Sequence, residues 1–351
     1  MKNILITGCA GFVYSHLARR LVNNGNYNVI GIDDLSCGFK KNIEDLQDNL
    51  NFHFAVIDAR NYDTIFEYLD CILRIDKLDA VVCGHARGEL NFCNDHPEKA
   101  IDINVNGTIQ MLKIAKEFEC KHFFFADTSA EYDSIPYVEA KEVVDIESRT
   151  VYNYGSTYPS NENQAPNTST PMGYYAITKM AASQFVRSMS KDFGFGSTLF
   201  RLFNVCGKSQ NILRDVPPVM GAFASKMLND ENPIIYGDRC RRRDYIHIDD
   251  VVDLHMLALE KRICMKDSET FNVGTNKNYS VYEIYRLVAK YVTGKDDELL
   301  WPNIDYLPDV VKQAQITLAD ITKTSKYFDW HHKKNINDMI KDTVESIRSK
   351  Q

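Results

Sequence analysis

Short apolar runs alternate with longer amphipathic stretches along the first part of the chain. The apolar runs predict strands at residues 4–7, 29–32, 52–57, 80–83, 122–126 and 199–203. The longest amphipathic stretches predict helices near residues 97–118 and 171–193. Buried strands that alternate with helices predict a parallel sheet covered on both faces. We therefore expect an α/β fold built on a doubly wound parallel sheet.

A glycine-rich turn joins the first predicted strand to the first helix. Gly8 and Gly11 lie where backbone N–H groups and the helix dipole can face a pyrophosphate. Asp33 closes the second strand, where a carboxylate can accept hydrogen bonds from both ribose hydroxyls and would repel a 2′-phosphate. This order predicts NAD rather than NADP as the cofactor. The alternative is an ordinary turn followed by a capping aspartate.

The turn departs from the usual pattern at Tyr14, where a third glycine is expected. That glycine normally lets the helix and the strand pack closely. A tyrosine must point away from the turn or push the helix outwards. We expect a bound dinucleotide with altered packing at this position.

Composition and charge narrow the class of protein. The chain has 351 residues, 44% of them hydrophobic, enough for one large core or two joined ones. Its net charge of −7 gives no basic surplus for nucleic acid or an anionic membrane. Without a membrane-spanning run or a secretory signal, we expect a cytoplasmic protein. Nine scattered cysteines with no CxxC pair predict reduced thiols rather than disulfides or a metal site.

A tyrosine and a lysine lie one helical turn apart. The spacing of Tyr175 and Lys179 puts the phenol and the ammonium on one face of a helix. A free tyrosine has a pKa of about 10, and a fixed positive charge beside it lowers that value. The pair could therefore take a proton from a sugar hydroxyl. Alone, the same spacing also fits an incidental contact on a tyrosine-rich helix.

Further motifs follow one another along the chain from about residue 3 to about residue 330. They are the segments Thr7–Phe12, Asp33–Gly38, Asn104–Thr108, Ala126–Tyr132, Tyr175–Lys179, Arg201–Gly207, Gly237–Val251, Phe271–Gly274 and Ala319–Lys323. This series resembles a known family, the extended short-chain dehydrogenase/reductases that act on nucleotide sugars.

This resemblance implies two domains and a homodimer. An NAD-binding Rossmann domain would take residues 1–203 plus 238–263, and a smaller nucleotide-sugar-binding α/β domain residues 204–237 plus 264–351. Helices near 97–118 and 171–193 would form a four-helix dimer interface. An apolar stripe on the second helix permits this interface but could instead face the sheet; its members are Ile177, Ala181, Phe185 and Met189.

The resemblance also implies a set of site residues. The catalytic residues would be Thr128, Tyr175 and Lys179, and the substrate-binding residues Thr128, Asn204 and Arg243. The cofactor-binding residues would be Gly8, Gly11, Phe12, Asp33, Asp58, Ala59, His85, Asn104, Tyr175 and Lys179. His85 would lie near the nicotinamide or the sugar, where it could assist proton transfer or simply contact a phosphate.

The arginines that would bind the substrate's diphosphate differ from the family pattern. A late arginine that usually pairs with the diphosphate is absent from Tyr306–Asp309. Arg243, with Arg214, would then carry more of the charge. The run Arg239–Arg243 could form a phosphate clamp, since arginine binds phosphate with two hydrogen bonds. For Arg239 and Arg241 we favour the alternative of a solvated loop.

The residues after Thr128 separate the reactions within the family. The resembling dehydratases and decarboxylases carry acids there, but this chain has Ser129 and Ala130, and a strand would turn Glu131 to the opposite face. This favours a nucleotide-sugar epimerase of the 4-epimerase type, as does the epimerase-like loop 135–139. A 4,6-dehydratase or 4-oxidoreductase remains the alternative. A dinucleotide-binding regulator or scaffold is the alternative outside enzymes, suggested by Tyr14 and the missing arginine.

Overall fold

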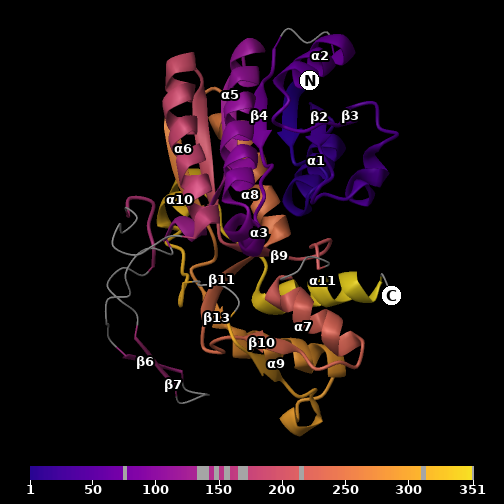
Figure 1. Ribbon diagram of the computed structural model, residues 1–351, viewed down its shortest axis with the longest axis vertical. Helices are drawn as coiled ribbons and strands as arrows, with labels where there is room; N and C mark the ends of the chain where they lie inside the picture. Colours follow the sequence, from indigo (N-terminus) through magenta and orange to yellow (C-terminus); the bar gives the residue numbers. More distant parts are fainter. Residues whose placement is uncertain are drawn as a thin grey trace.

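The computed structural model describes residues 1–73, 77–132, 142–145, 150–153, 159–164, 173–212, 217–309 and 314–349. Its larger half is a seven-stranded parallel sheet, at the top of Figure 1, with the order β12-β8-β5-β4-β1-β2-β3. The expected Rossmann-type α/β fold is confirmed. In chain order the strands are β1 (Lys2–Thr7), β2 (Tyr27–Asp33), β3 (Phe52–Val56), β4 (Ala80–Cys83), β5 (His122–Thr128), β8 (Gly196–Leu202) and β12 (Ser268–Val273).

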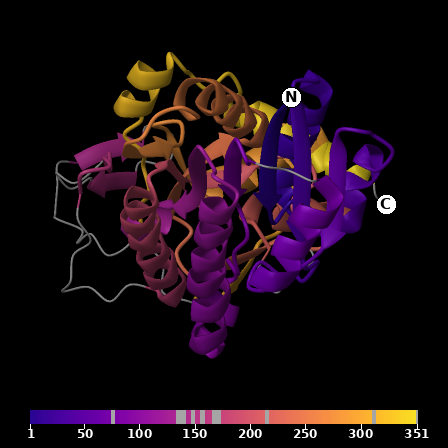
Figure 2. The ribbon, with the colours of Figure 1, turned by 90° about the horizontal axis from the view of Figure 1, so that it is seen from above.

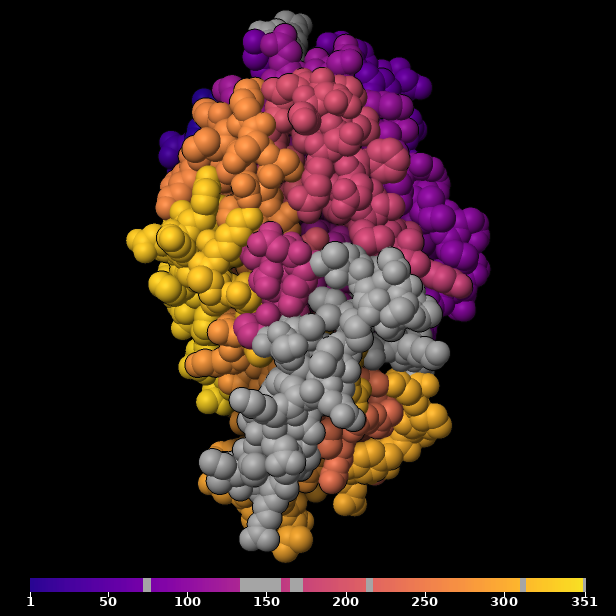
Figure 3. Space-filling model, turned by 90° about the vertical axis from the view of Figure 1, so that its left-hand side faces the viewer, coloured from indigo at the N-terminus to yellow at the C-terminus, as the bar shows by residue number. Residues whose placement is uncertain are grey.

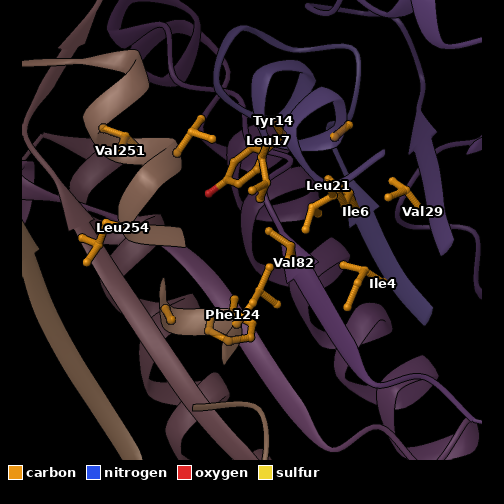
Figure 4. Packing of buried hydrophobic residues seen from close by; sticks show 14 of the residues in the cluster. Ile4, Ile6, Tyr14, Leu17, Leu21, Val29, Val82, Phe124, Val251 and Leu254 are labelled. Carbon is orange, nitrogen blue, oxygen red and sulfur yellow. The ribbon is translucent and has the colours of Figure 1, made fainter. Parts of the chain in front are cut away.

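Helices cover both faces of this sheet (Figure 2). Successive side chains of a strand point to opposite faces, so Ile4 and Ile6 pack on one side and Leu5 on the other. The first side is covered by α1 (Phe12–Asn24) and α8 (Ile248–Arg262), with Phe328 of α10 (Thr322–Phe328) in the same core. The second is covered by α2 (Tyr62–Leu73), α5 (Gly107–Glu117) and α6 (Tyr174–Phe193). Figure 4 shows side chains of α1 and α8 meeting above the first face.

The helix predicted near residues 97–118 contains a change of winding. Pro97 begins α4 (Pro97–Ile101), a π-helical turn follows at Asp102–Asn106, and α5 continues from Gly107. A π-turn is rare and is often found at functional sites, because it re-aims one side chain out of the helical register. Here the buried side chain of Asn104 lies within it. The short helix α3 (Leu90–Asp95) precedes this segment.

The smaller half lies below the sheet in Figure 1. A three-stranded sheet has the order β13-β11-β9, and a second core lies between three helices. The strands are β9 (Asn204–Cys206), β11 (Arg242–His247) and β13 (Asn278–Ser280), with the pair β10 (Ile234–Tyr236) and β14 (Asp305–Leu307). The helices are α7 (Val219–Leu228), α9 (Val281–Thr293) and α11 (Ile336–Arg348). The 3₁₀ helices in the described residues are Lys40–Leu46, Ser129–Tyr132 and Glu298–Leu300.

Two strands lie in different halves from those assigned by the sequence. The strand β12 belongs to the large sheet, although residues 264–351 were assigned to the smaller domain. Conversely, β11 pairs with β9 and β13, although residues 238–263 were assigned to the larger one. The buried end of β12 completes the edge of the sheet beside β8, a long-range pairing that motif order does not specify.

A long segment between Tyr132 and α6 lies mostly outside the described residues, including the loop 135–139. Within it, β6 (Glu142–Asp145) and β7 (Thr150–Asn153) form an antiparallel pair. Residues 159–164 lie beside the C-terminal segment, where Ser160 pairs with Ala319 (Figure 3). In the part of the chain that the structure describes, no helix is both long enough and apolar enough to span a bilayer.

Candidate active site

A cavity of about 1050 Å³ lies at the carboxyl ends of the parallel strands and extends to the smaller half. Residues that follow β1, β2, β3, β4, β5 and β8 line one part of it, and residues of α7, β10 and β11 line the other. This is where open parallel sheets bind ligands. All the predicted site residues except Asn104 line this cavity: Gly8, Gly11, Phe12, Asp33, Asp58, Ala59, His85, Thr128, Tyr175, Lys179, Asn204 and Arg243.

The glycine turn forms the cavity wall at the end of β1. Gly8 has a φ of +68°, and an added Cβ would lie only 3.0 Å from the backbone of Gly84 and His85. Gly11 precedes α1 without any side-chain cap, so the first N–H groups of the helix remain available to a ligand. The turn thus has the close backbone approach and the open helix N-terminus that a dinucleotide diphosphate requires.

Tyr14 is accommodated by a glycine on the neighbouring strand end. Its ring is buried, and a Cβ at Gly84 would lie 2.1 Å from the ring atom Cδ2. The ring packs edge-on against His255 of α8, 5.7 Å between centroids, and Figure 4 shows it between α1 and α8. The glycine that the turn lacks at position 14 is therefore matched by one at position 84. The sequence predicted altered packing here but did not identify the partner.

Two acids lie at the ends of β2 and β3. Asp33 accepts hydrogen bonds from the backbone N–H of Ala10 at 3.0 Å and of Leu35 at 2.8 Å. Burial raises the pKa of this carboxyl, and the two hydrogen bonds oppose that shift. Asp33 thus caps the turn and also lines the cavity. Asp58, beside Ala59, is paired with Arg60 at 2.5 Å, which lowers its pKa.

His85 is held as a neutral ring at the end of β4. Its Nδ1 is 2.8 Å from Thr7 Oγ1, and a Cβ at Gly107 would lie 2.6 Å from its Nε2. Burial, and then the positive charge of Lys179, lower the pKa of His85 to about 4. A role of His85 in proton transfer was expected because a histidine ordinarily titrates near neutrality. The lowered pKa of His85 argues against that role.

Asn104 lies behind the cavity wall. Its Oδ1 accepts a hydrogen bond from Arg87 N at 2.7 Å, and its Nδ2 donates to Arg87 O at 3.1 Å and to Thr178 at 2.9 Å. The side chain is completely buried. It therefore ties the loop after β4 to α6, a positioning role beside the predicted cofactor contact.

The three predicted catalytic residues converge on the cavity from β5 and α6. Thr128 is the last residue of β5, and Tyr175 and Lys179 lie in the first turns of α6. A Cβ at Gly88 would lie 4.0 Å from the Tyr175 hydroxyl, so that hydroxyl faces the loop after β4. Lys179 Nζ lies 4.0 Å from the centre of the Phe125 ring.

Lys179 provides the test of whether the cavity fits a nicotinamide cofactor. It is 1% exposed, and among the described residues its Nζ has no hydrogen-bond partner. A buried ammonium without a partner costs free energy, which the hydroxyls of a bound ribose would recover. Burial lowers the pKa of Lys179, whereas Cys83, Asp127 and Glu131 favour its charged form. The residues of this cavity thus fit a bound nicotinamide cofactor.

A buried ion network lies behind Thr128. Arg201 on β8 donates to Asp127 at 3.2 Å, to Glu131 at 2.6 Å and to the Tyr132 hydroxyl at 3.0 Å. Residues Ser129–Tyr132 form a 3₁₀ turn, so the expectation that a strand orients Glu131 is wrong. Glu131 nevertheless lies outside the cavity lining, because Arg201 holds it. Burial and then Asp127 raise its pKa, against the opposing effect of Arg201.

The sequence does indicate part of this network, through two charged residues within predicted strands. Asp127 and Arg201 lie in otherwise apolar runs, and they are directly paired in the register of β5 and β8. Opposite charges within two buried strands imply that the strands are neighbours, because a buried charge needs a partner.

The arginines near β11 differ from the expectation in part. Arg243 lines the cavity, and its Nη1 donates to Arg242 O at 2.9 Å. Arg239 is exposed over the Tyr282 ring, in agreement with a solvated position. Arg241 is not solvated: it is buried, lines the cavity and is ion-paired with Asp309. Arg214 lies outside the described residues.

One side-chain group in the described residues has the composition of a metal site, namely His247, Asp249 and Asp342. Its histidine is already engaged: Nδ1 accepts the N–H of Asp249 at the start of α8, and Nε2 bonds to Asp342 at 3.1 Å. None of the three lines the cavity. The group therefore serves to join α11 to the start of α8.

The fold and this cavity define a dinucleotide-binding protein of the extended short-chain dehydrogenase/reductase class. More narrowly, residues 4–274 match the NAD dependent epimerase/dehydratase family, to which the chain belongs, and its cofactor is NAD.

The relatives include both reaction types. The chain is 29% identical over 351 residues to a UDP-glucose 4-epimerase of Lactobacillus helveticus, covering 96% of this chain and 94% of that protein. It is 26% identical over 314 residues to the dTDP-D-glucose 4,6-dehydratase of Homo sapiens, covering 88% and 79%. The crystal structure of UDP-glucose 4-epimerase with UDP-glucose from Thermotoga maritima has 26% identity and a TM-score of 0.77, covering 99% of both chains.

Proposed function

We propose that this protein is an NAD-dependent nucleotide-sugar 4-epimerase. One observation carries the choice of reaction: among the described residues, Ser129 and Ala130 line the cavity after Thr128, and the lining carboxylate beside them, Asp127, is paired with Arg201. Elimination of water needs a further acid or base there, and Asp127 and Glu131 are instead bound to Arg201. Inversion at C4 needs none, because the ketone can turn over between the two hydride transfers.

The proposed roles are those that the family resemblance implies, and they are supported by the fact that these side chains line one cavity. Tyr175 takes the proton of the C4 hydroxyl, and Thr128 hydrogen-bonds to the same oxygen and orients it. Lys179 holds the nicotinamide ribose, and its charge favours the phenolate of Tyr175. Asn204 and Arg243 contact the nucleotide sugar, with Arg243 pairing with its diphosphate. The chemistry that NAD would supply at this site is reversible hydride transfer.

A 4,6-dehydratase is the second candidate, and the similarity to the human dTDP-D-glucose 4,6-dehydratase supports it. The first substrates to test are UDP-hexoses, since the Lactobacillus helveticus and Thermotoga maritima relatives are UDP-glucose 4-epimerases. Substrate deuterated at C4 is incubated with the protein and NAD and followed by NMR.

An epimerase gives an inverted sugar that keeps the label at C4. A free keto sugar, or deuterium at C6, identifies a dehydratase, and stoichiometric NADH without inversion identifies a 4-oxidoreductase. Tyr175→Phe should lower the rate at least ~100-fold, since the proton acceptor is lost, while nucleotide-sugar binding changes little. A dinucleotide-binding scaffold would convert none of the nucleotide sugars tested.

We also infer a homodimer formed through α5 and α6. These helices lie side by side on one face of the sheet (Figure 2). Ile177 and Phe185 are 41% and 42% exposed, so at these positions the stripe faces away from the sheet. Replacing both by Glu should give monomers in light scattering, and an unchanged mass would contradict this interface.

A further inference from the structure

The ammonium of Lys179 is buried between α6 and the large sheet. Lys179 is 1% exposed, and its Nζ lies 4.0 Å from the centre of the Phe125 ring on β5. Burial lowers the pKa of Lys179, so the neutral amine is favoured unless a negative charge lies nearby. A neutral amine would not favour the phenolate of Tyr175. The proposed chemistry therefore needs a group that keeps Lys179 charged.

Asp127 lies on the same face of β5 as Phe125. Successive side chains of a strand alternate, so residues 125 and 127 share the face that α6 covers. The Asp127 carboxylate is completely buried, and its Oδ2 accepts a hydrogen bond from Arg201 Nε at 3.2 Å. Among the described residues, neither Asp127 Oδ1 nor Lys179 Nζ has a hydrogen-bond partner. A buried acceptor and a buried donor are thus both left over in the layer between β5 and α6.

Three acidic groups favour the charged form of Lys179, namely Cys83, Asp127 and Glu131. Burial raises the pKa of Cys83 to about 11, so this thiol is neutral at pH 7. Burial and then Asp127 raise the pKa of Glu131, which reduces its negative charge near neutral pH. Asp127 is therefore the main source of negative charge toward the ammonium.

The other ionisable side chains that face this pair in the described residues do not supply a negative charge. His85, after β4, has a pKa of about 4 and is neutral at pH 7. Arg201 of β8 and Arg187 of α6 are positive and interact with Asp127 from its other side. Tyr175, on the same helix as Lys179, is the group whose ionisation the ammonium would favour.

We propose that Asp127 is the residue that keeps the buried ammonium of Lys179 protonated. Asp127 acts through Lys179 rather than on the substrate, and Arg201 holds its carboxylate in place. The proposal rests on the proposed function in one respect, namely that the ammonium favours the phenolate of Tyr175. The family resemblance implied no role for Asp127.

The test is a titration of Lys179 in the full-length protein with NAD bound. Lysines that carry an isotope label at Cε report the charge of each ammonium by NMR, and Lys179→Met identifies the signal. The parent should show a charged ammonium at pH 7. Asp127→Asn removes one negative charge, so the pKa of Lys179 should fall by about 1–3. Asp127→Ser should lower it to a similar extent, because both variants remove the charge and only one changes the size.

Matched controls are Asp267→Asn and Glu131→Gln. Asp267 is also paired with a buried arginine, Arg262 at 2.9 Å, but it lies outside the cavity lining. Its replacement should leave the pKa of Lys179 at the parent value. Glu131→Gln should lower that pKa less than Asp127→Asn does. Thermal unfolding checks the fold of each variant.

The pH profile of turnover gives a second measurement. Because Asp127→Asn would lose the Lys179 ammonium at lower pH, the alkaline limb of its kcat/KM profile should move to lower pH. In the Lys179→Met background, the same change should leave the alkaline limb where it is. A purely structural role of Asp127 would lower activity equally in both backgrounds.

A parent whose Lys179 is neutral at pH 7 overturns the proposal, as does an unchanged pKa of Lys179 in the Asp127 variants. An equal fall of that pKa in Glu131→Gln or in Asp267→Asn also overturns it. Because the titration needs no sugar, its result is separate from the proposed reaction. A lowered pKa in Asp127→Asn beside a parent that inverts no sugar would keep this role of Asp127 and remove the epimerase.

Discussion

The two pairs of strand ends that form the cavity floor are built on opposite principles. At the ends of β1 and β4, neutral groups are packed in direct contact, with Gly8 against Gly84 and His85, and the Tyr14 ring against Gly84. At the ends of β5 and β8, buried charges are paired through Arg201. The first region leaves no room for an added atom, and in the second two carboxyl groups share one guanidinium, that of Arg201. The cofactor turn is thus shaped by contact, and the proposed catalytic end by electrostatics.

Removing charge at the catalytic end should have the largest effect on activity. Lys179→Met removes the ammonium that favours the Tyr175 phenolate, so the pKa of Tyr175 rises and less phenolate is present at pH 7. We expect kcat/KM at pH 7 to fall roughly 10²- to 10⁴-fold, with the acid limb of the pH profile moved to higher pH. An unchanged pH profile would show that the lysine does not act on the tyrosine.

Adding one carbon at the cofactor end should have the next largest effect. Gly84→Ala places a methyl group 2.1 Å from the Tyr14 ring, and the overpacking should cost about 1–3 kcal/mol of unfolding free energy and weaken NAD binding. Tyr14→Gly, which instead leaves a cavity in the core, should also destabilise the protein.

Combining the two changes separates a specific contact from general damage. The double variant should be more stable than the sum of the two single effects predicts, by roughly 0.5–3 kcal/mol, because each change makes room for the other. Gly173→Ala is a suitable control, since nothing lies within 4 Å of its added Cβ. Strict additivity of the two single effects would argue against the coupling of positions 14 and 84.

The smallest expected effect concerns pH and stability. Burial and Asp127 raise the pKa of Glu131 above its usual value of 4.5. Between pH 4.5 and the raised pKa, the native protein therefore binds a proton that the unfolded chain releases. This stability is complete below pH 4.5 and is lost as the pH rises through the raised pKa. Glu131→Gln should therefore gain stability relative to the parent on going from pH 5 to pH 8, on the order of 1 kcal/mol. A relative loss instead would mean that Arg201 dominates the ionisation of Glu131.

The sequence predicted what is encoded locally. Most strands of the sheet, the turn at Gly8 and the helix that carries Tyr175 follow from apolar periodicity and from motifs within a few residues. It did not predict that β12 joins the large sheet beside β8. That pairing depends on which edge remains open after the other strands have assembled.

The same limit applies to the candidate site. Part of the cavity lining was predicted, because the family motifs are short and lie at strand ends. Their partners were not: Gly84 for Tyr14, Arg201 for Glu131, and Asp309 for Arg241. Each partner lies tens of residues away, and only the folded chain brings the two together.

The edge position of β12 has a consequence for synthesis on the ribosome. When residue 202 has emerged, β8 can already pair with β5 along one edge. Its other edge stays unpaired until residues 268–273, which form β12, have been made. During that interval a buried, apolar strand exposes unpaired backbone groups, the kind of edge that recruits strands from other chains. The nascent chain should thus be most prone to aggregation, and most dependent on chaperones, over this stretch of elongation.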